Sequence, residues 1–376
     1  MNYIYIIMVD KLSVVIKDFK DSLHIKSKNG VDYYYVIVKT PFFKKEYYLG
    51  KYVDDEKTLL LYQQKLNIKI HGDILEFIVT RNKKTFKANY ISDDDYFKLE
   101  FLRFGYNNFL KQFSKPDLDK YESIVYTKYV YGTTNVEGNT YSLRDTQLTL
   151  NDGLTVAGKK KREFFEIENY SKLKEYLLKK KKFSFDVSFI KKVHSFILRN
   201  IDENSAGELR KVDVFIGGTE FVPVPGILVE DELNKLVDWY SKNLGKIYPV
   251  ELIALFHQKF EEIHPFPDGN GRVGRELARL MLNTFGYPSI FIGPKEREEY
   301  LKCLDSGNDK KHSPMVKFFV DRLIEANYSI ILDAKSSLET TLKSDSFSKL
   351  KVGLATNQLK LIKKKLSEIP LNHYED

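Results

Sequence analysis

Residues 264 to 275 read HPFPDGNGRVGR and separate two stretches of helical periodicity. Before them, apolar residues recur at the three- and four-residue spacing of a buried helix face: Leu252, Ile253, Leu255, Phe256, Phe260 and Ile263. After them, the spacing resumes at Leu277, Leu280, Met281 and Leu282. Pro265 and Pro267 cannot continue the first helix, because proline lacks the backbone N–H and clashes with the preceding turn. The pattern predicts a helix, a tight loop and a second helix.

The glycines of this loop indicate an anion site. Gly269 and Gly271 allow backbone conformations that point several N–H groups to one place, and the following helix adds its partial positive charge there. Arg272 and Arg275 are three residues apart, so they lie on one helix face and can bind phosphate oxygens together. The loop is therefore predicted to hold a polyphosphate.

His264 and Asp268 add the chemistry of a transfer reaction. The imidazole of His264 can accept a proton near neutral pH. The carboxylate of Asp268 would repel a bare phosphate but suits Mg²⁺ bridging two phosphates, because magnesium takes one or two carboxylates and keeps several waters. These groups together predict attack by a hydroxyl on a metal-bound nucleotide phosphate.

These residues resemble the motif of the Fic family, which runs His, any residue, Phe, any residue, Asp or Glu, Gly, Asn, Gly, Arg, two residues, Arg. Every fixed position is matched, by His264, Phe266, Asp268, Gly269, Asn270, Gly271, Arg272 and Arg275. The resemblance implies a mainly α-helical core at residues 162–330 and a protein adenylyltransferase, which transfers AMP from ATP to a protein Ser, Thr or Tyr hydroxyl. It implies His264 as the catalytic base and Asp268 as the magnesium ligand. Gly269, Asn270, Gly271, Arg272 and Arg275 would bind the nucleotide phosphates.

A second motif lies upstream, where residues 133–138 read TTNVEG. This segment resembles the inhibitory motif of Fic proteins, in which Ser or Thr and three residues precede Glu and then Gly or Asn, here Thr133, Glu137 and Gly138. A glutamate brought against Arg275 forms an ion pair with the guanidinium that should hold the terminal phosphate of ATP. The resemblance therefore implies an autoinhibited enzyme of the class with an N-terminal inhibitory helix. A helix that simply ends at Gly138, with Glu137 in solvent, is the alternative.

Two other segments resemble parts of the Fic core. Residues 166–169, Glu-Ile-Glu-Asn, resemble the start of its first helix, and residues 206–210, Ala-Gly-Glu-Leu-Arg, resemble the approach to its flap. The flap would be a β-hairpin over 212–225, with strands at 214–216 and 221–224, and its exposed edge would dock the target protein. A hairpin that only covers the nucleotide is compatible with this role. His194 lies on an apolar helical stripe and is interpreted as a core histidine.

Residues 296–308 resemble the segment that lines the nucleoside pocket of the family. Tyr300 would cover the adenine and Asn308 would hydrogen-bond the base or ribose. Simple packing roles remain open for both.

Two other functions use the same residues differently. In the first, the chain removes AMP from a modified protein, with Glu137 aligning a water and His264 protonating the leaving hydroxyl. In the second, the core only senses ATP and a basic N-terminal module binds nucleic acid. Residues 1–90 hold 16 Lys and Arg against 10 Asp and Glu, an excess of +6 within a net charge of +8. A solvated lysine-rich surface is the favoured explanation of this excess, because no known nucleic-acid motif accompanies it.

The composition of the chain excludes several classes of protein. Hydrophobic residues make up 43% and aromatic residues 14% of the 376 residues, which excludes a mainly disordered chain. The one cysteine, Cys303, cannot form an internal disulfide. Apolar runs are shorter than the ~20 residues of a membrane span, so we expect a cytoplasmic protein without a membrane segment. A homodimer stays open.

The flanking regions are expected to differ from the core. Residues 1–92 predict a small β-rich or α+β module, with strands at 1–9, 33–38, 46–50, 68–70 and 75–79, a hairpin turn at Asn29-Gly30 and one short helix at 58–66. Residues 93–161 predict a helical extension that carries the inhibitory motif. Residues 331–376 predict a linker and one helix at 355–369. His24 and His71 lack neighbours at metal-ligand spacing.

Overall fold

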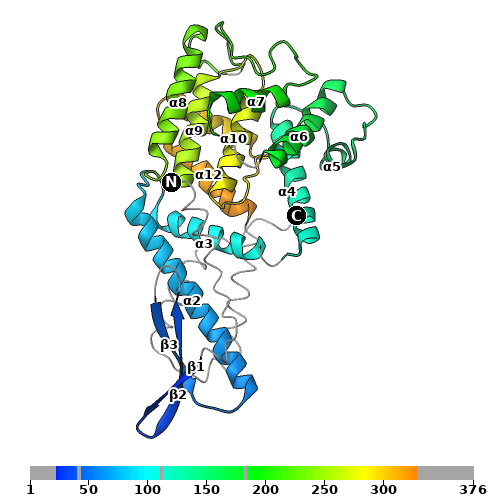
Figure 1. Cartoon of the computed structure of the whole chain (residues 1–376). Coiled ribbons are helices and arrows are strands. Elements are labelled where there is room, and N and C mark those ends of the chain that lie inside the picture. The colour runs from blue at the N-terminus through cyan, green and yellow to red at the C-terminus, as the bar shows by residue number, and fades with distance from the viewer. Residues whose placement is uncertain (1–22, 40–43, 111–112, 181–183, 218, 328–376) are drawn as a thin grey trace. The chain divides into compact units, whose positions relative to one another are not determined.

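The computed structural model describes residues 23–39, 44–110, 113–180, 184–217 and 219–327. The chain divides into two compact units (Figure 1). Among the described residues, one contains 23–84, 93–109 and Asn327, and the other contains 85–92 and 110–326. The predicted strand at 1–9 and helix at 355–369 lie outside the described residues.

The first unit contains a three-stranded antiparallel sheet in the order β1-β2-β3, formed by β1 (Leu23–Lys28), β2 (Val31–Lys39) and β3 (Lys44–Lys51). Asn29 and Gly30 connect the first two strands at φ of 51° and 73°, the positive values that a tight hairpin turn needs. Side chains alternate between the faces of a sheet. One face is buried, by Tyr34, Val36, Val38, Tyr47 and Leu49.

The helix α2 (Glu56–Thr85) corrects the prediction for the rest of this module. The expected short helix at 58–66 and the expected strands at 68–70 and 75–79 are all parts of this one helix. Tyr62, Leu66 and Ile70 are buried, and their four-residue spacing places them on one helix face against the sheet. The prediction was wrong because β-branched residues in short windows were given more weight than this longer period. The helix α3 (Asp93–Leu110) starts with the predicted acidic turn.

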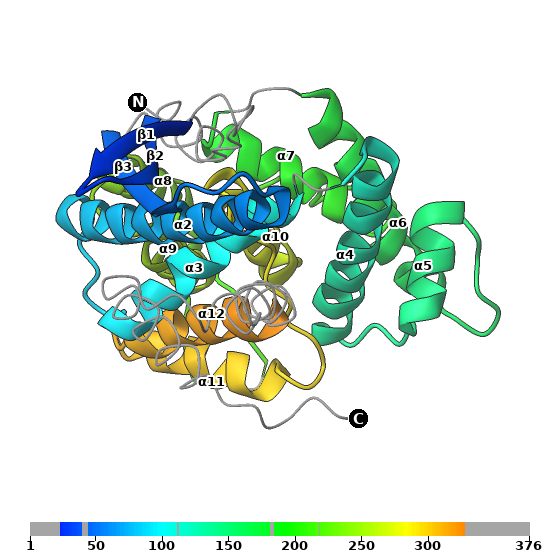
Figure 2. The same cartoon turned by 90° about the horizontal axis from the view of Figure 1, so that it is seen from below.

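The second unit is helical, as expected for a mainly α core. Its helices run in chain order: α4 (Lys115–Val136), α5 (Leu143–Asp152), α6 (Lys161–Lys179), α7 (Val187–Ile197), the 3-10 turn η2 (Gly226–Leu228), α8 (Val229–Asn243), α9 (Pro249–Ile263), α10 (Asn270–Thr284), α11 (Arg297–Asn308) and α12 (Ser313–Ala326). Helices α8, α10, α11 and α12 pack on α9, and α4, α5 and α6 form a separate group that meets α10 through α4 (Figure 2). In the part of the chain that the structure describes, no helix is long and apolar enough to cross a membrane.

The helices α9 and α10 confirm the predicted helix, loop and helix around residues 264 to 275. The helix α9 is buried on nearly all sides, and its Leu252, Phe256 and Phe260 are almost completely buried. The helix α9 ends at Ile263 and α10 begins at Asn270, so only six residues connect them. Two packed helices therefore fix both ends of the loop.

The segment 212–225 does not form the predicted β-hairpin. Its described residues belong to no strand and make no strand pair. Pro223 and Pro225 have no backbone N–H to donate to a ladder. The guanidinium of Arg210 instead joins the two arms, because it donates hydrogen bonds to the carbonyl oxygens of Val212 and Val224.

Candidate functional site

The loop between α9 and α10 has a fixed backbone. His264 adopts the left-handed conformation at φ 51° where it caps α9, and Gly269 adopts it at φ 81° where it caps α10. The side chain of Asn270 spans the loop: its Oδ1 accepts from the N–H of Phe266 at 2.8 Å and its Nδ2 donates to the carbonyl of Phe266 at 2.7 Å. The Asn270 side chain therefore shapes the loop, and the second hydrogen of its Nδ2 is not used in these two bonds. Its contact with phosphate stays a prediction.

His194 supports the loop from α7. Its ring stacks on Phe266 with centroids 3.7 Å apart and planes 5° from parallel. Its Nδ1 accepts from the N–H of Gly207 at 2.8 Å, so Nε2 carries the proton and donates to the carbonyl of Asp268 at 3.0 Å. The sequence correctly indicated a core histidine. It did not indicate that this histidine holds the loop.

His264 is placed to act as a base. Arg210 donates from Nε to the His264 carbonyl at 2.7 Å, which fixes the backbone at the end of α9. Burial, together with the positive charge of Arg210, lowers the pKa of His264 to about 4. The imidazole is therefore neutral at pH 7 and can accept a proton. Its buried Nδ1 has no hydrogen-bond partner among the described residues.

Arg275 is bound by the upstream motif. It is 3% exposed, and it donates from Nε to Thr133 Oγ1 at 2.8 Å, and from Nη2 to the Thr133 carbonyl at 3.0 Å and Glu137 Oε1 at 2.6 Å. Burial would raise the pKa of Glu137, but the guanidinium groups of Arg275 and Arg272 outweigh it and hold this pKa below its usual value. Gly138 follows at φ 95°, which favours glycine after the helix end. The expected ion pair between Glu137 and Arg275 is present.

The carboxylate of Glu137 lies close to Gly271, the second glycine of the motif. A Cβ atom on Gly271 would lie 2.5 Å from Glu137 Oε1 and 2.8 Å from Arg275 Nη1. Gly271 belongs to the first turn of α10, where backbone N–H groups have no intrahelical partners. An anion thus already occupies the place that the sequence indicated for phosphate.

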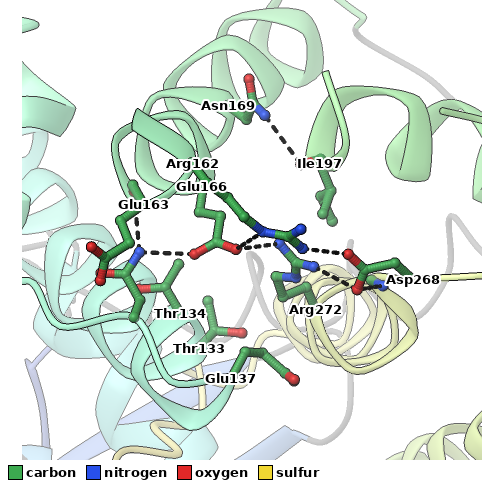
Figure 3. Close-up of polar contacts among 12 residues, drawn as sticks. Thr133, Thr134, Glu137, Arg162, Glu163, Glu166, Asn169, Ile197, Asp268 and Arg272 are labelled. Atoms are coloured by element: carbon green, nitrogen blue, oxygen red, sulfur yellow. Dashed lines mark hydrogen bonds and ion pairs between the residues drawn. The ribbon is translucent and has the colours of Figure 1, made fainter. Parts of the chain in front are cut away.

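Arg272 belongs to a closed ring of four charges (Figure 3). Its Nη1 donates to Glu166 Oε1 at 3.2 Å and its Nη2 to Asp268 Oδ1 at 3.0 Å. Arg162 completes the ring, donating from Nε to Glu166 Oε1 at 3.3 Å and from Nη2 to Asp268 Oδ2 at 2.5 Å. Burial would raise the pKa of Asp268, but Arg272 and Arg162 outweigh it and keep this carboxylate ionised. We define these four residues as the charge ring.

The charge ring also contacts the turn that follows the inhibitory motif. The Nδ2 of Asn139 donates to Glu166 Oε2 at 2.9 Å and to the carbonyl of Glu163 at 3.1 Å, and the N–H of Thr140 donates to Glu163 Oε1 at 2.7 Å. The first two turns of α6 therefore hold both Arg272 and the turn after α4. The Glu-Ile-Glu-Asn signature had marked Glu166, but nothing in the sequence indicated these partners.

Comparison with known proteins agrees with this geometry. The sequence model of the Fic/DOC family matches residues 184–282, which include the whole loop. Residues 184–282 therefore form a Fic/DOC family domain. Among curated relatives, protein adenylyltransferase fic-1 of Caenorhabditis elegans is 32% identical over 230 residues, 60% of this chain and 45% of the relative. Protein adenylyltransferase Fic of Aedes aegypti is 32% identical over 225 residues, 59% of this chain and 44% of the relative. The chain thus spans about half the length of the curated relatives it matches.

Solved structures show the same fold. A Fic domain protein from Bacteroides thetaiotaomicron is 26% identical with a TM-score of 0.55, and the match covers 64% of this chain and 97% of that one. Fic-1 from C. elegans, residues 134–508, is 24% identical with a TM-score of 0.57, covering 74% of this chain and 88% of that one.

Asp268 fits magnesium only as a ligand shared with a nucleotide. No group of three His, Cys, Asp or Glu side chains gathers in the described part of the chain, so the described residues by themselves offer no complete metal shell. The Asp268 side chain is 42% exposed and ionised, which leaves room for waters and phosphate oxygens around a cation. A Mg²⁺ ion would have to replace Arg162 on this carboxylate.

Tyr300 does not have the position expected for covering adenine in the Fic pocket. It is 1% exposed, its hydroxyl bonds His257 Nε2 at 2.8 Å, and Arg275 lies over its ring at 5.7 Å. A ring that is covered in this way has no free face on which a base could stack. Tyr300 packs beneath Arg275 instead. Asn308 is the last residue of α11 and is partly exposed, and the structure gives it no contact with the Fic loop at 264–275.

Buried histidines should make this Fic core sensitive to acid. Burial lowers the pKa of His194 and His264 to about 4 and that of His257 to about 3, against ~6.5 in an unfolded chain. Between these values the unfolded state binds more protons. The free energy of unfolding should therefore fall as the pH falls from about 6.5 to about 4, by up to ~1.4 kcal/mol per pH unit for each histidine. Urea unfolding at successive pH values measures this slope, and His194→Gln should reduce it. A constant free energy of unfolding across this window would contradict neutral buried imidazoles.

Proposed function

We propose that this chain is a protein adenylyltransferase, and that Glu137 inhibits it. The observation that carries the proposal is the Glu137 carboxylate on Gly271 and Arg275, because it identifies the first turn of α10 as an anion site beside the neutral base His264. The names of the curated relatives, protein adenylyltransferase fic-1 and Fic, support the reaction class.

The reaction would join a protein hydroxyl to the α-phosphate of ATP. The hydroxyl oxygen attacks the α-phosphorus, His264 accepts its proton, and the bond to the β-phosphate breaks, so the products are AMP-protein and pyrophosphate. Arg272 and Arg275 would stabilise the charge on the departing pyrophosphate, and the first N–H groups of α10 would bind the α-phosphate. Asp268 would hold Mg²⁺, which supplies further charge neutralisation on the phosphates.

Inhibition follows from competition for one arginine. While Glu137 and Thr133 hold Arg275, its guanidinium cannot bind the terminal phosphates, and ATP lacks the contact that orients its α-phosphate for attack. The Glu137 side chain is 38% exposed, so it can leave this position without opening the core. The end of α4 is then the element that must move when the enzyme becomes active.

The protein target would dock along residues 212–225. Three apolar side chains of this segment are largely exposed: Val212 at 69%, Phe215 at 87% and Val222 at 65%. Arg210 bonds both the arms of this segment and the carbonyl of His264, so a peptide held there lies beside the base. Main-chain hydrogen bonds to the segment would position the target hydroxyl.

Intact-protein mass spectrometry tests the reaction class. Glu137→Gly protein is incubated with Mg²⁺ and, in separate samples, ATP, UTP, GTP or CTP. A mass gain equal to one AMP in the ATP sample is the expected result. A gain of phosphate alone, or a gain only with another nucleotide, would contradict adenylylation. Loss of AMP from a modified protein, without any gain, would indicate the reverse reaction instead.

Asn139 should contribute to inhibition through the turn after α4. It is 5% exposed, and its Nδ2 bonds to Glu163 and Glu166 fix the turn that presents Glu137. Asn139→Ala should raise self-labelling with α-labelled ATP severalfold, but less than Glu137→Gly does, because Glu137 itself remains. The matched control is Asn234→Ala, since Asn234 is exposed on α8 and bonds only within that helix. Equal labelling of the two variants would exclude this role for Asn139.

A further inference from the structure

The sheet of the N-terminal unit has a second face that the proposed reaction does not use. Tyr34, Val36 and Tyr47 point to the buried face, so the residues between them point the other way. The strand register places two rows on this outer face: His24, Tyr35 and Tyr48 form one row, and Lys26, Tyr33 and Lys51 form the other. We call these six residues the tyrosine face.

The rings of the tyrosine face lie close together at the surface. The ring of Tyr48 is centred 5.8 Å from that of Tyr33 and 5.5 Å from that of Tyr35, and His24 stacks on Tyr35 at 6.1 Å. Tyr48 is 36% exposed, and Tyr33 and Tyr35 are partly exposed. The three tyrosines lie on the solvent side of a small sheet whose core is on the other face. They form a surface on which planar groups can stack.

Positive charge surrounds these rings. The three strands carry six lysines against one aspartate and one glutamate, and one of these lysines, Lys45, is paired with Asp73 at 2.6 Å. The glutamate, Glu46, is already paired with Lys26 at 2.7 Å and with His24 at 2.9 Å. Lys51 and Lys28 are exposed, and the structure gives neither an acidic partner within the described residues. The ligand of this face should therefore carry negative charge as well as flat rings.

We propose that the tyrosine face binds single-stranded nucleic acid. Unpaired bases would stack on the tyrosine rings, while the lysines on both sides would bind the phosphates. In a duplex the faces of the bases are covered by the neighbouring bases. A duplex therefore offers phosphates to the lysines but no free base face to the tyrosines. An acidic protein surface likewise offers charge without stacking groups. The combination of close tyrosines and flanking lysines favours the single strand over both.

The test measures binding of fluorescein-labelled single-stranded DNA and RNA of mixed sequence, and of the matching duplex, to the full chain by fluorescence anisotropy. ATP is absent, so the result does not depend on the adenylyltransferase proposal. The single strands should bind more tightly than the duplex. Their affinity should fall with salt, since each phosphate contact adds about 0.7 to the slope of log K against log salt concentration.

Two variants separate stacking from charge. Tyr48→Leu should weaken single-strand binding about tenfold or more with an unchanged salt slope, because it removes a ring but no charge. Lys51→Glu should weaken binding and reduce the salt slope. The matched control Lys57→Glu, at an exposed position on α2, should change binding less than Lys51→Glu, and thermal melting checks that every variant folds.

Three results would overturn the proposal. These are no anisotropy change with any probe at low salt, duplex binding as tight as single-strand binding, and equal effects of Lys51→Glu and Lys57→Glu. If Tyr48→Leu does not fold, the comparison of the two exposed lysines decides the outcome alone.

Discussion

Glu137→Gly should raise self-labelling by α-labelled ATP at least tenfold over the wild-type chain. The substitution removes the carboxylate that bonds Arg275 and covers Gly271, so the guanidinium becomes available to the terminal phosphates of ATP. A hydrogen bond to a charged group contributes ~1.5–3 kcal/mol, and each 1.4 kcal/mol changes an equilibrium tenfold. Initial labelling rates at fixed ATP and Mg²⁺ measure the effect.

The matched control for this variant lies on the same helix. Glu122→Gly makes the same substitution at an exposed position of α4, so it reports the cost of glycine in the helix without touching Arg275. Its labelling should stay at the wild-type level. If Glu137→Gly also stays there while its thermal melting shows an intact fold, the inhibitory role of Glu137 is wrong.

His264→Ala, made in the Glu137→Gly background, should reduce labelling by at least a hundredfold. General base catalysis contributes ~10²–10⁴-fold, and no other imidazole in this loop can accept the hydroxyl proton. ATP binding should persist, because the glycines and arginines of the loop are unchanged. Single-turnover labelling measures the loss, and equilibrium dialysis with ATP measures the binding.

A second histidine serves as the control for this loss. His312→Ala changes a partly buried histidine just before α12, whose nearest acidic partner is Glu262 at 3.9 Å, and it should keep most of the labelling. Turnover that survives in His264→Ala would exclude His264 as the base. Loss of ATP binding together with labelling would instead indicate that the substitution disrupts the loop.

Local patterns predicted the parts of the site that lie close together in the chain. The helix, loop and helix at 252–282 follow from apolar spacing and two prolines, and Gly269 adopts the positive φ that glycine allows. The pairing of Glu137 with Arg275, across 138 residues, was predicted only because two short motifs resemble one family. Neither motif alone indicates that Glu137 and Arg275 lie in contact in the fold.

The residues that support the loop were missed, because their contacts join distant segments. Arg162 reaches Asp268 across 106 residues, His194 reaches the carbonyl of Asp268 across 74, and Arg210 reaches that of His264 across 54. Single-sequence patterns carry no signal for such pairs. The strands expected at 68–70 and 75–79 failed for a related reason, since the sheet that packs on Tyr62, Leu66 and Ile70 decides that this segment is helical.

The position of Glu137 on Gly271 makes this carboxylate a tethered ligand of the site. Its effective concentration is set by the chain that connects it to Arg275, so it does not fall when the protein is diluted. The fraction of restrained molecules should then be the same at low and high expression. Under the proposed inhibition, control of the enzyme belongs to whatever shifts the end of α4 away from the first turn of α10.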